Sequence, residues 1–141
     1  MPKDTGELEN EIKKAPDVRD FWEENTGDMQ AFTLAGFLQK LLAEKQLTRQ
    51  QVAAATGLDK SYVYHIFAGQ KRPGREKLLA IALAMRLDER DAQHLLHYGG
   101  APSLYPRDRW DSILLHALHR HLSVMEANDL LDKLGETTLL L

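Results

Sequence analysis

The chain has 141 residues, 43% of them hydrophobic, which suffices for one globular domain with helical additions, and no apolar run reaches the length of a membrane span. The absence of cysteine excludes a disulfide framework and thiolate metal sites. A net charge of −3 excludes a uniformly basic protein, and these properties together predict a cytoplasmic location.

Apolar residues recur at spacings of three and four, and alternating β-branched runs are absent, so the sequence predicts an all-α fold. We divide the chain into a helical arm (1–30), a central domain (31–100) and a C-terminal helical pair (101–141). In chain order, the predicted helices cover Glu7–Lys14, Val18–Glu24, Thr33–Lys45, Arg49–Thr56, Lys60–Ala68, Arg75–Met85, 89–98, Asp108–His121 and 124–134.

The arm is acidic, and its helical pattern stops at Gly27 and Asp28. We expect a solvated arm that packs Phe21 and Trp22 on the central domain. A competing hypothesis is that the arm folds over a basic surface and weakens binding to an anionic partner. Deletion of residues 1–28 separates the two, because only the second predicts tighter binding.

Two short central helices are joined by a turn whose residues fit a reversal of the chain. Thr48 and Gln51 form a capping box that begins the helix Arg49–Thr56. Gly57 ends this helix, because the turn needs a left-handed backbone conformation. Asp59 caps the helix that follows. The pattern predicts two helices that cross at a steep angle.

The residues of these two helices separate an inner from an outer side. Ala53 is small enough for close contact between the helices, and Leu58 fills the space beneath the turn. Val52, Val63 and Ile66 are predicted to face the core. The side chains that then point outward from the second helix are those of Lys60, Ser61, Tyr64 and His65. A helix presents such a surface to the major groove of DNA.

Positive charge is concentrated in the same part of the chain. Residues 46–86 hold seven basic and two acidic side chains, net +5, whereas residues 1–45 and 87–141 each have a net charge of −4. Attraction to phosphate depends on the local field, so this distribution favours a nucleic-acid partner. Chance clustering on a solvated surface explains the charge pattern, taken alone, equally well.

The stretch from about Thr33 to Asp88 resembles the lambda-repressor/Cro family of helix-turn-helix proteins, over about two fifths of the chain. The residues that carry the resemblance are Ala53, the turn Gly57-Leu58-Asp59, Val63, Ile66, and Gly69 followed by Lys71-Arg72-Pro73. The resemblance implies a five-helix DNA-binding domain that acts as a bacterial or phage transcription regulator.

The resemblance also implies roles for individual side chains. The expected readers of base edges are Lys60, Ser61, Tyr64 and His65. Lys60 is the best suited of them, because lysine donates to O6 and N7 of guanine. The expected phosphate contacts are Arg49, Lys71, Arg72 and Arg75.

Some residues depart from the family pattern. Phe67 and Ala68 stand where the family often has polar residues, which removes a usual contact. Gly74 replaces a side-chain helix cap, and we expect this to leave Arg75 free to face phosphate. The bulky Tyr64 and its neighbour Tyr62 are compatible either with a position along the DNA backbone or with packing on the protein surface.

The apolar residues of the C-terminal helices are compatible with plain core and with a dimer seam. A lone recognition helix reads few base pairs, and proteins of this fold often pair so that two helices meet successive grooves. Our hypothesis is that residues 102–141 help to form a homodimer.

The sequence gives little support for a metal site or for an enzyme active site. His94 and His97, like His116 and His119, have a spacing that can bind zinc, but both pairs lie off the apolar stripes, which favours solvated surface. We expect no metal and no cofactor. No phosphate-cradling glycine loop or nucleophile–base–orienter set is recognisable, so an enzyme is not expected.

The sequence therefore predicts sequence-specific binding of double-stranded DNA, with the helix Lys60–Ala68 in the major groove. The alternative is a protein-interaction adaptor that keeps the fold without binding DNA. Binding to random duplex DNA distinguishes the two.

Overall fold

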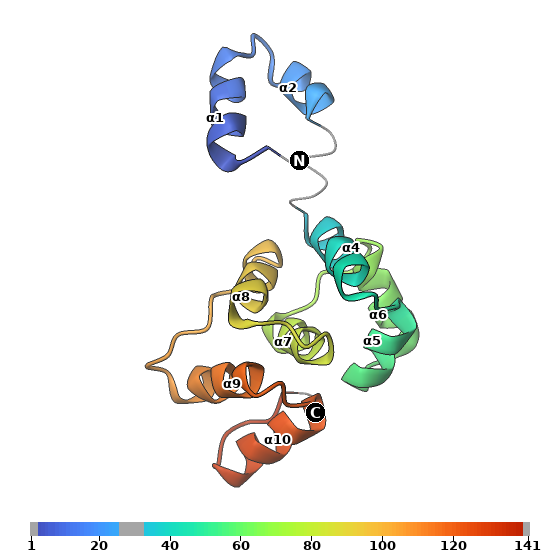
Figure 1. The fold of residues 1–141 in the computed structure, drawn as a ribbon, viewed down its shortest axis with the longest axis vertical. Helices are drawn as coiled ribbons and strands as arrows, with labels where there is room; N and C mark the ends of the chain where they lie inside the picture. The colour runs from blue at the N-terminus through green and yellow to red at the C-terminus, as the bar shows by residue number, and fades with distance from the viewer. Residues whose placement is uncertain (1–2, 26–32, 140–141) are drawn as a thin grey trace.

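The structure is a computed structural model that describes residues 3–25 and 33–139 (Figure 1). The described residues form helices and no strand, which confirms the predicted all-α fold. None of these described helices is long and apolar enough to pass through a lipid bilayer. The break predicted at Gly27 and Asp28 lies outside the described residues.

The N-terminal helices α1 (Thr5–Lys14) and α2 (Val18–Glu24) pack against each other and are drawn apart from the other helices in Figure 1. Phe21 is buried, but it is not part of the main hydrophobic core. Trp22 is 49% exposed. The arm thus buries Phe21 separately, contrary to our expectation that this side chain packs on the central domain.

A largely buried helix lies at the centre of the remaining body. This helix is α7 (Arg75–Ala84), whose residues 78–83 are all buried. A helix that is apolar on every side needs neighbours all round, and α5, α8, α9 and α10 pack against it. The other central helices are α4 (Leu34–Lys45), α5 (Arg49–Thr56), α6 (Lys60–Phe67) and α8 (Glu89–Tyr98).

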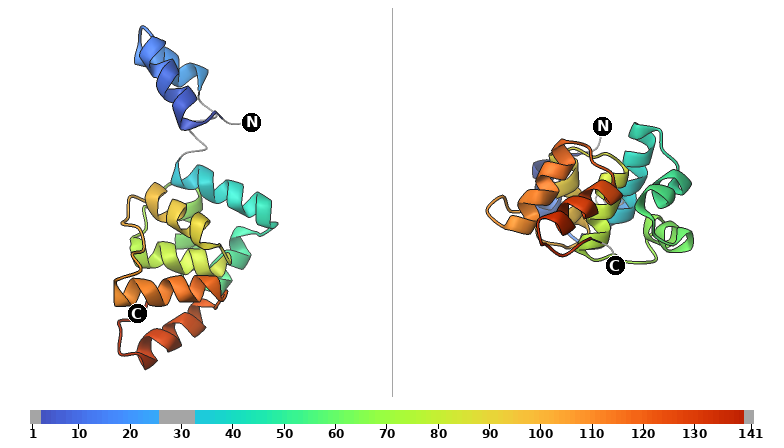
Figure 2. Two further views of the ribbon diagram at one scale, coloured as in Figure 1. Left: turned by 60° about the vertical axis from the view of Figure 1, so that its left-hand side comes forward. Right: turned by 90° about the horizontal axis from the view of Figure 1, so that it is seen from below.

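The C-terminal helices α9 (Arg109–His119) and α10 (Val124–Lys133) share this core. Figure 2 shows them stacked on the side of α7 that faces away from α4. Leu104, from the connection before α9, and Leu139, from the tail, are buried in the same cluster. Most apolar side chains of the pair are core residues, namely Ile113, Leu114, Leu115, Ala117, Leu118, Val124, Ala127 and Leu131.

Helix ends follow the local signals closely. The capping boxes at Thr48 and Ser123 are both formed, each hydroxyl accepting a backbone N–H three residues on, at 3.1 Å. Observed bounds lie within about two residues of the predicted ones. Two ends differ by two residues: α1 begins at Thr5 and not at Glu7, and α9 ends at His119 and not at His121, because His121 has a left-handed φ of 52°.

Candidate nucleic-acid interface

The turn between α5 and α6 has the conformation that its sequence predicts. Gly57 has a φ of +75°, and its N–H donates to the carbonyl of Ala53 at 3.2 Å. The buried hydroxyl of Thr56 donates to the same carbonyl at 2.8 Å and accepts the N–H of Leu58 at 3.1 Å. Thr56 therefore links Ala53, before the turn, to Leu58, after it, by two hydrogen bonds. The sequence analysis did not predict this role, although Ser and Thr hydroxyls commonly make such local bonds.

Helix α6 is divided into a buried and an exposed side. Val63, Ile66 and Phe67 are at most 1% exposed and join the main core. On the opposite side lie the predicted base readers, of which Lys60, Ser61 and His65 are exposed and Tyr64 is half-buried. Asp59 caps the helix through the N–H of Tyr62, so this side begins in the first helical turn.

Two tyrosines on α6 carry basic side chains from three helices over their rings. The guanidinium carbon of Arg49, at the start of α5, lies 4.7 Å from the ring centroid of Tyr64. The Nζ of Lys60 lies 5.6 Å from the same centroid. On α7, the Nζ of Lys77 lies 4.8 Å from the ring centroid of Tyr62. These distances are within the range of cation–π interactions.

The comparison with known families addresses this part of the chain. Residues 38–91 match a family model described as helix-turn-helix, and the matched segment runs from α4 into α8 through the turn. The match agrees with the resemblance of this segment to the lambda-repressor/Cro-like helix-turn-helix family. The match supports a DNA-binding regulator in general terms. No curated protein and no solved structure matches the chain.

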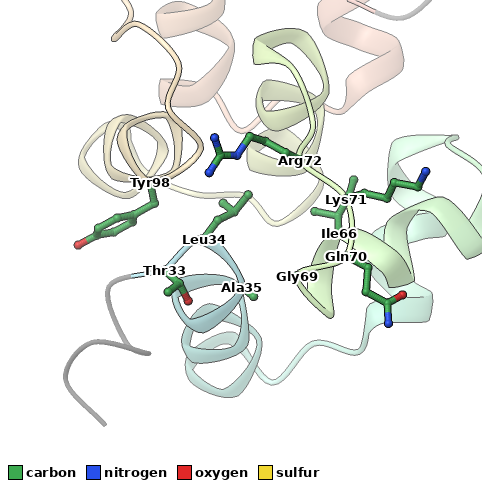
Figure 3. Close-up of a pocket in the computed structure, with 9 residues that line it drawn as sticks. All are labelled: Thr33, Leu34, Ala35, Ile66, Gly69, Gln70, Lys71, Arg72 and Tyr98. Atoms are coloured by element: carbon green, nitrogen blue, oxygen red, sulfur yellow. The ribbon is translucent and has the colours of Figure 1, made fainter. Parts of the chain in front are cut away.

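A basic loop follows α6 in the helix-turn-helix domain. The carbonyl of His65 accepts the N–H of Gln70 at 2.8 Å and that of Lys71 at 3.3 Å, which fixes the loop against the end of α6. Lys71 and Arg72 are exposed, and Figure 3 shows that their side chains point in different directions. Arg72 extends toward Tyr98 of α8, whereas Lys71 points away from it.

A hollow of 610 Å³ lies between this loop and the start of α4 (Figure 3). Leu34 and Ala35 contribute apolar surface to it, while Lys71 and Arg72 contribute cationic side chains. The hollow is therefore part of the positively charged surface that Lys71 and Arg72 form on the helix-turn-helix domain.

Arg75 does not have the position that the sequence predicted. Its guanidinium donates to both carboxylate oxygens of Asp111 on α9, at 2.9 and 2.8 Å. It also donates to the carbonyls of Pro102 at 2.9 Å and Ser103 at 2.8 Å. The prediction that Arg75 is free to contact phosphate is wrong, because its donors are already satisfied inside the protein.

The partner of Arg75 is itself buried. Burial alone would raise the pKa of Asp111, but the hydrogen bonds from Arg75 and from the N–H of Tyr105 outweigh it, so the pKa is lowered. The same ion pair raises the pKa of Arg75. Both groups therefore stay charged, and the pair joins the helix-turn-helix domain to the C-terminal helices.

The histidine pairs lie on the surface. All four side chains are exposed, and the Nε2 of His119 lies 2.7 Å from the carboxylate of Glu89. Within residues 3–25 and 33–139, no group of three acidic, histidine or cysteine side chains is placed to hold a metal ion.

Proposed function

We propose that this protein is a sequence-specific regulator of bacterial or phage transcription that inserts α6 into the major groove of double-stranded DNA. The observation that carries the proposal is the outer side of α6, where exposed polar side chains lie beside cations from α5, α7 and the basic loop. A major groove is bordered by two phosphate backbones, and the base edges at its floor carry hydrogen-bond donors and acceptors. The cations complement the phosphates, and the polar side chains complement the base edges.

The residues divide into two proposed roles. Lys60, Ser61 and His65 are proposed to read base edges, because they are exposed on the outer side of α6. Tyr64, the fourth predicted reader, is half-buried and its ring contacts two cations, which favours a different role. The proposed phosphate contacts are Arg49, Lys71 and Arg72, all of them exposed.

We propose three functional units: the arm, the helix-turn-helix domain and the C-terminal pair. The regulator is proposed to act in the cytoplasm, without catalytic activity.

We also propose a homodimer, since one recognition helix reads too few base pairs for useful specificity. Met125 and Leu134 remain 75% and 46% exposed on the C-terminal helices, where a second copy would cover them. Light scattering tests this: a monomer that stays monomeric on DNA contradicts the dimer.

Salt dependence of binding to random duplex DNA tests the main proposal. Each phosphate contact contributes about 0.9 to the slope of log affinity against log salt concentration. The double variant Lys71→Ala/Arg72→Ala is expected to flatten that slope by roughly 1.8 and to weaken all duplexes alike. Lys13→Ala/Lys14→Ala, which removes the same charge from the exposed side of the arm, is the matched control.

Lys60→Ala tests base readout separately. It is expected to relax the preference at one base position, at a cost of about 1–3 kcal/mol, in a selection from random duplexes. A wild-type protein with no salt-dependent affinity for duplex DNA would contradict the proposed function and favour the protein-interaction adaptor.

A further inference from the structure

The tyrosines of α6 stand on the two flanks of its outer side. Successive residues of a helix are rotated by about 100°, so Ser61 and His65, four residues apart, share one strip. The same rotation places Tyr62 on one flank of that strip and Tyr64 on the other. The contacts agree with this placement, because Tyr64 meets Arg49 of α5 whereas Tyr62 meets Lys77 of α7.

We propose that Tyr62 and Tyr64 are positioning residues: their rings hold Lys77 and Arg49 toward the two phosphate backbones that border the groove, and the ring of Tyr64 also holds Lys60, the proposed base reader, in place. The inference rests on the proposed function and adds Lys77, which sequence reasoning did not single out, to the phosphate contacts. Cations on both flanks match the geometry of a major groove about 12 Å wide, in which a helix has one backbone on each side.

The rings act by reducing the freedom of long side chains. Free lysine and arginine side chains lose rotamer entropy when DNA orders them, and this loss weakens binding. A side chain that already rests on an aromatic face loses less rotamer entropy, and its charge stays close to where the DNA will lie. Arg49, Lys60 and Lys77 are all exposed, so each remains accessible while it contacts a ring.

This mechanism assigns the gain in affinity to the aromatic ring of each tyrosine and not to its hydroxyl. A phenylalanine ring also attracts cations, so Tyr62→Phe/Tyr64→Phe is expected to keep affinity within about twofold of wild type. Leucine keeps an apolar side chain without a π face. Tyr62→Leu/Tyr64→Leu removes three contacts, each worth about two- to fivefold at exposed sites, so we expect a loss of affinity of at least about eightfold.

The experiment measures fluorescence anisotropy of the full-length protein on a labelled random duplex across a series of salt concentrations. Tyr105→Leu is the control for loss of a tyrosine, because this side chain is 57% exposed and lies outside α6. Lys77→Ala is expected to flatten the salt slope by about 0.9, and Lys133→Ala, an exposed lysine on α10, to leave it unchanged. Thermal unfolding verifies that each variant is folded.

The outcomes distinguish this inference from the proposed function. Absence of salt-dependent binding by the wild type overturns the proposed function, and this inference with it. If the wild type binds but the phenylalanine variant loses as much affinity as the leucine variant, the hydroxyls contact DNA and the inference is overturned. Wild-type affinity of a folded leucine variant also overturns it. Should the leucine variant fail to fold, an unchanged salt slope for Lys77→Ala overturns it independently.

Discussion

Replacing Asp111 by asparagine tests how the C-terminal helices are fixed to the helix-turn-helix domain. The carboxylate accepts hydrogen bonds from Arg75 at 2.9 and 2.8 Å and from the N–H of Tyr105 at 2.9 Å. Asparagine keeps the size of the side chain but removes its charge. The Arg75 guanidinium keeps its bonds to the carbonyls of Pro102 and Ser103, so the variant removes the counter-ion together with the hydrogen bonds that one carboxylate oxygen accepts.

The magnitude follows from the burial of the ion pair. The side chains of Asp111 and Arg75 are 9% and 24% exposed. Removing one partner of a fully buried pair costs about 3–5 kcal/mol. Because part of Arg75 stays in contact with water, we expect Asp111→Asn to lower the free energy of unfolding by about 2–3 kcal/mol. In a chain of this length that corresponds to a decrease in Tm of roughly 7–10 °C.

Urea unfolding followed by circular dichroism at neutral pH measures this loss. The matched control is Arg109→Gln, which breaks the 3.1 Å pair with Glu136, where Arg109 is 80% exposed. An exposed pair contributes at most about 1 kcal/mol. If Asp111→Asn costs no more than Arg109→Gln, the reasoning from burial is refuted.

The same pair predicts a dependence on pH. The pKa of Asp111 is lowered in the folded protein, so its contribution to stability is complete above the ordinary aspartate pKa of about 3.9. This contribution is lost as the pH falls through the lowered pKa of the folded state. The stability difference between wild type and Asp111→Asn should stay constant from about pH 5 to 8 and shrink in more acidic solution. A difference that widens with acid would contradict the assigned direction of the shift.

Three further substitutions and one deletion test other parts of the fold by the same unfolding assay. Gly57→Ala is expected to cost about 1–2 kcal/mol through backbone strain at φ +75°, although nothing lies within 4 Å of the added carbon; a cost near zero would contradict the strain. Gly99→Ala is expected to cost about 1–3 kcal/mol for a different reason, because the added carbon would clash with Cδ1 of the buried Leu78; an unchanged Tm would show that this leucine moves freely. Thr48→Ala removes the cap of α5 and should cost about 1 kcal/mol. Deletion of residues 1–28 should change the Tm of the remaining body by less than about 2 °C, since the buried side chain of the arm is not part of the main core, and a larger decrease would show that the arm packs on it.

Elements governed by local signals were predicted most closely from the sequence. Helix α5 has the bounds predicted from Thr48 and Gly57, because a capping hydroxyl and a left-handed glycine act within one turn of the chain. The buried side of α6 was also predicted, since Val63 and Ile66 follow helical periodicity. Thr56 was missed because its hydroxyl has several local acceptors, and the sequence does not choose among them.

The assignment of Arg75 failed for a physical reason. Gly74 provides no side-chain cap, as predicted, but the partner of Arg75 is 36 residues away on α9. A local pattern contains no information about such a pair, because it depends on how α9 packs on α7. The reciprocal bonds between Gln93 and Leu104, at 2.8 and 2.9 Å, have the same origin and equally leave no local signal.

The contacts between cations and the tyrosines of α6 could be predicted from the sequence only in part. The charge distribution predicted a basic surface, and periodicity places Tyr62 and Tyr64 on opposite flanks of the helix. Which cations meet which ring depends on the packing of α5 and α7, and only the structure pairs Arg49 with Tyr64 and Lys77 with Tyr62. A net charge of −3 is compatible with DNA binding for the same reason, because phosphate attraction depends on where a few cations are held and not on the total charge.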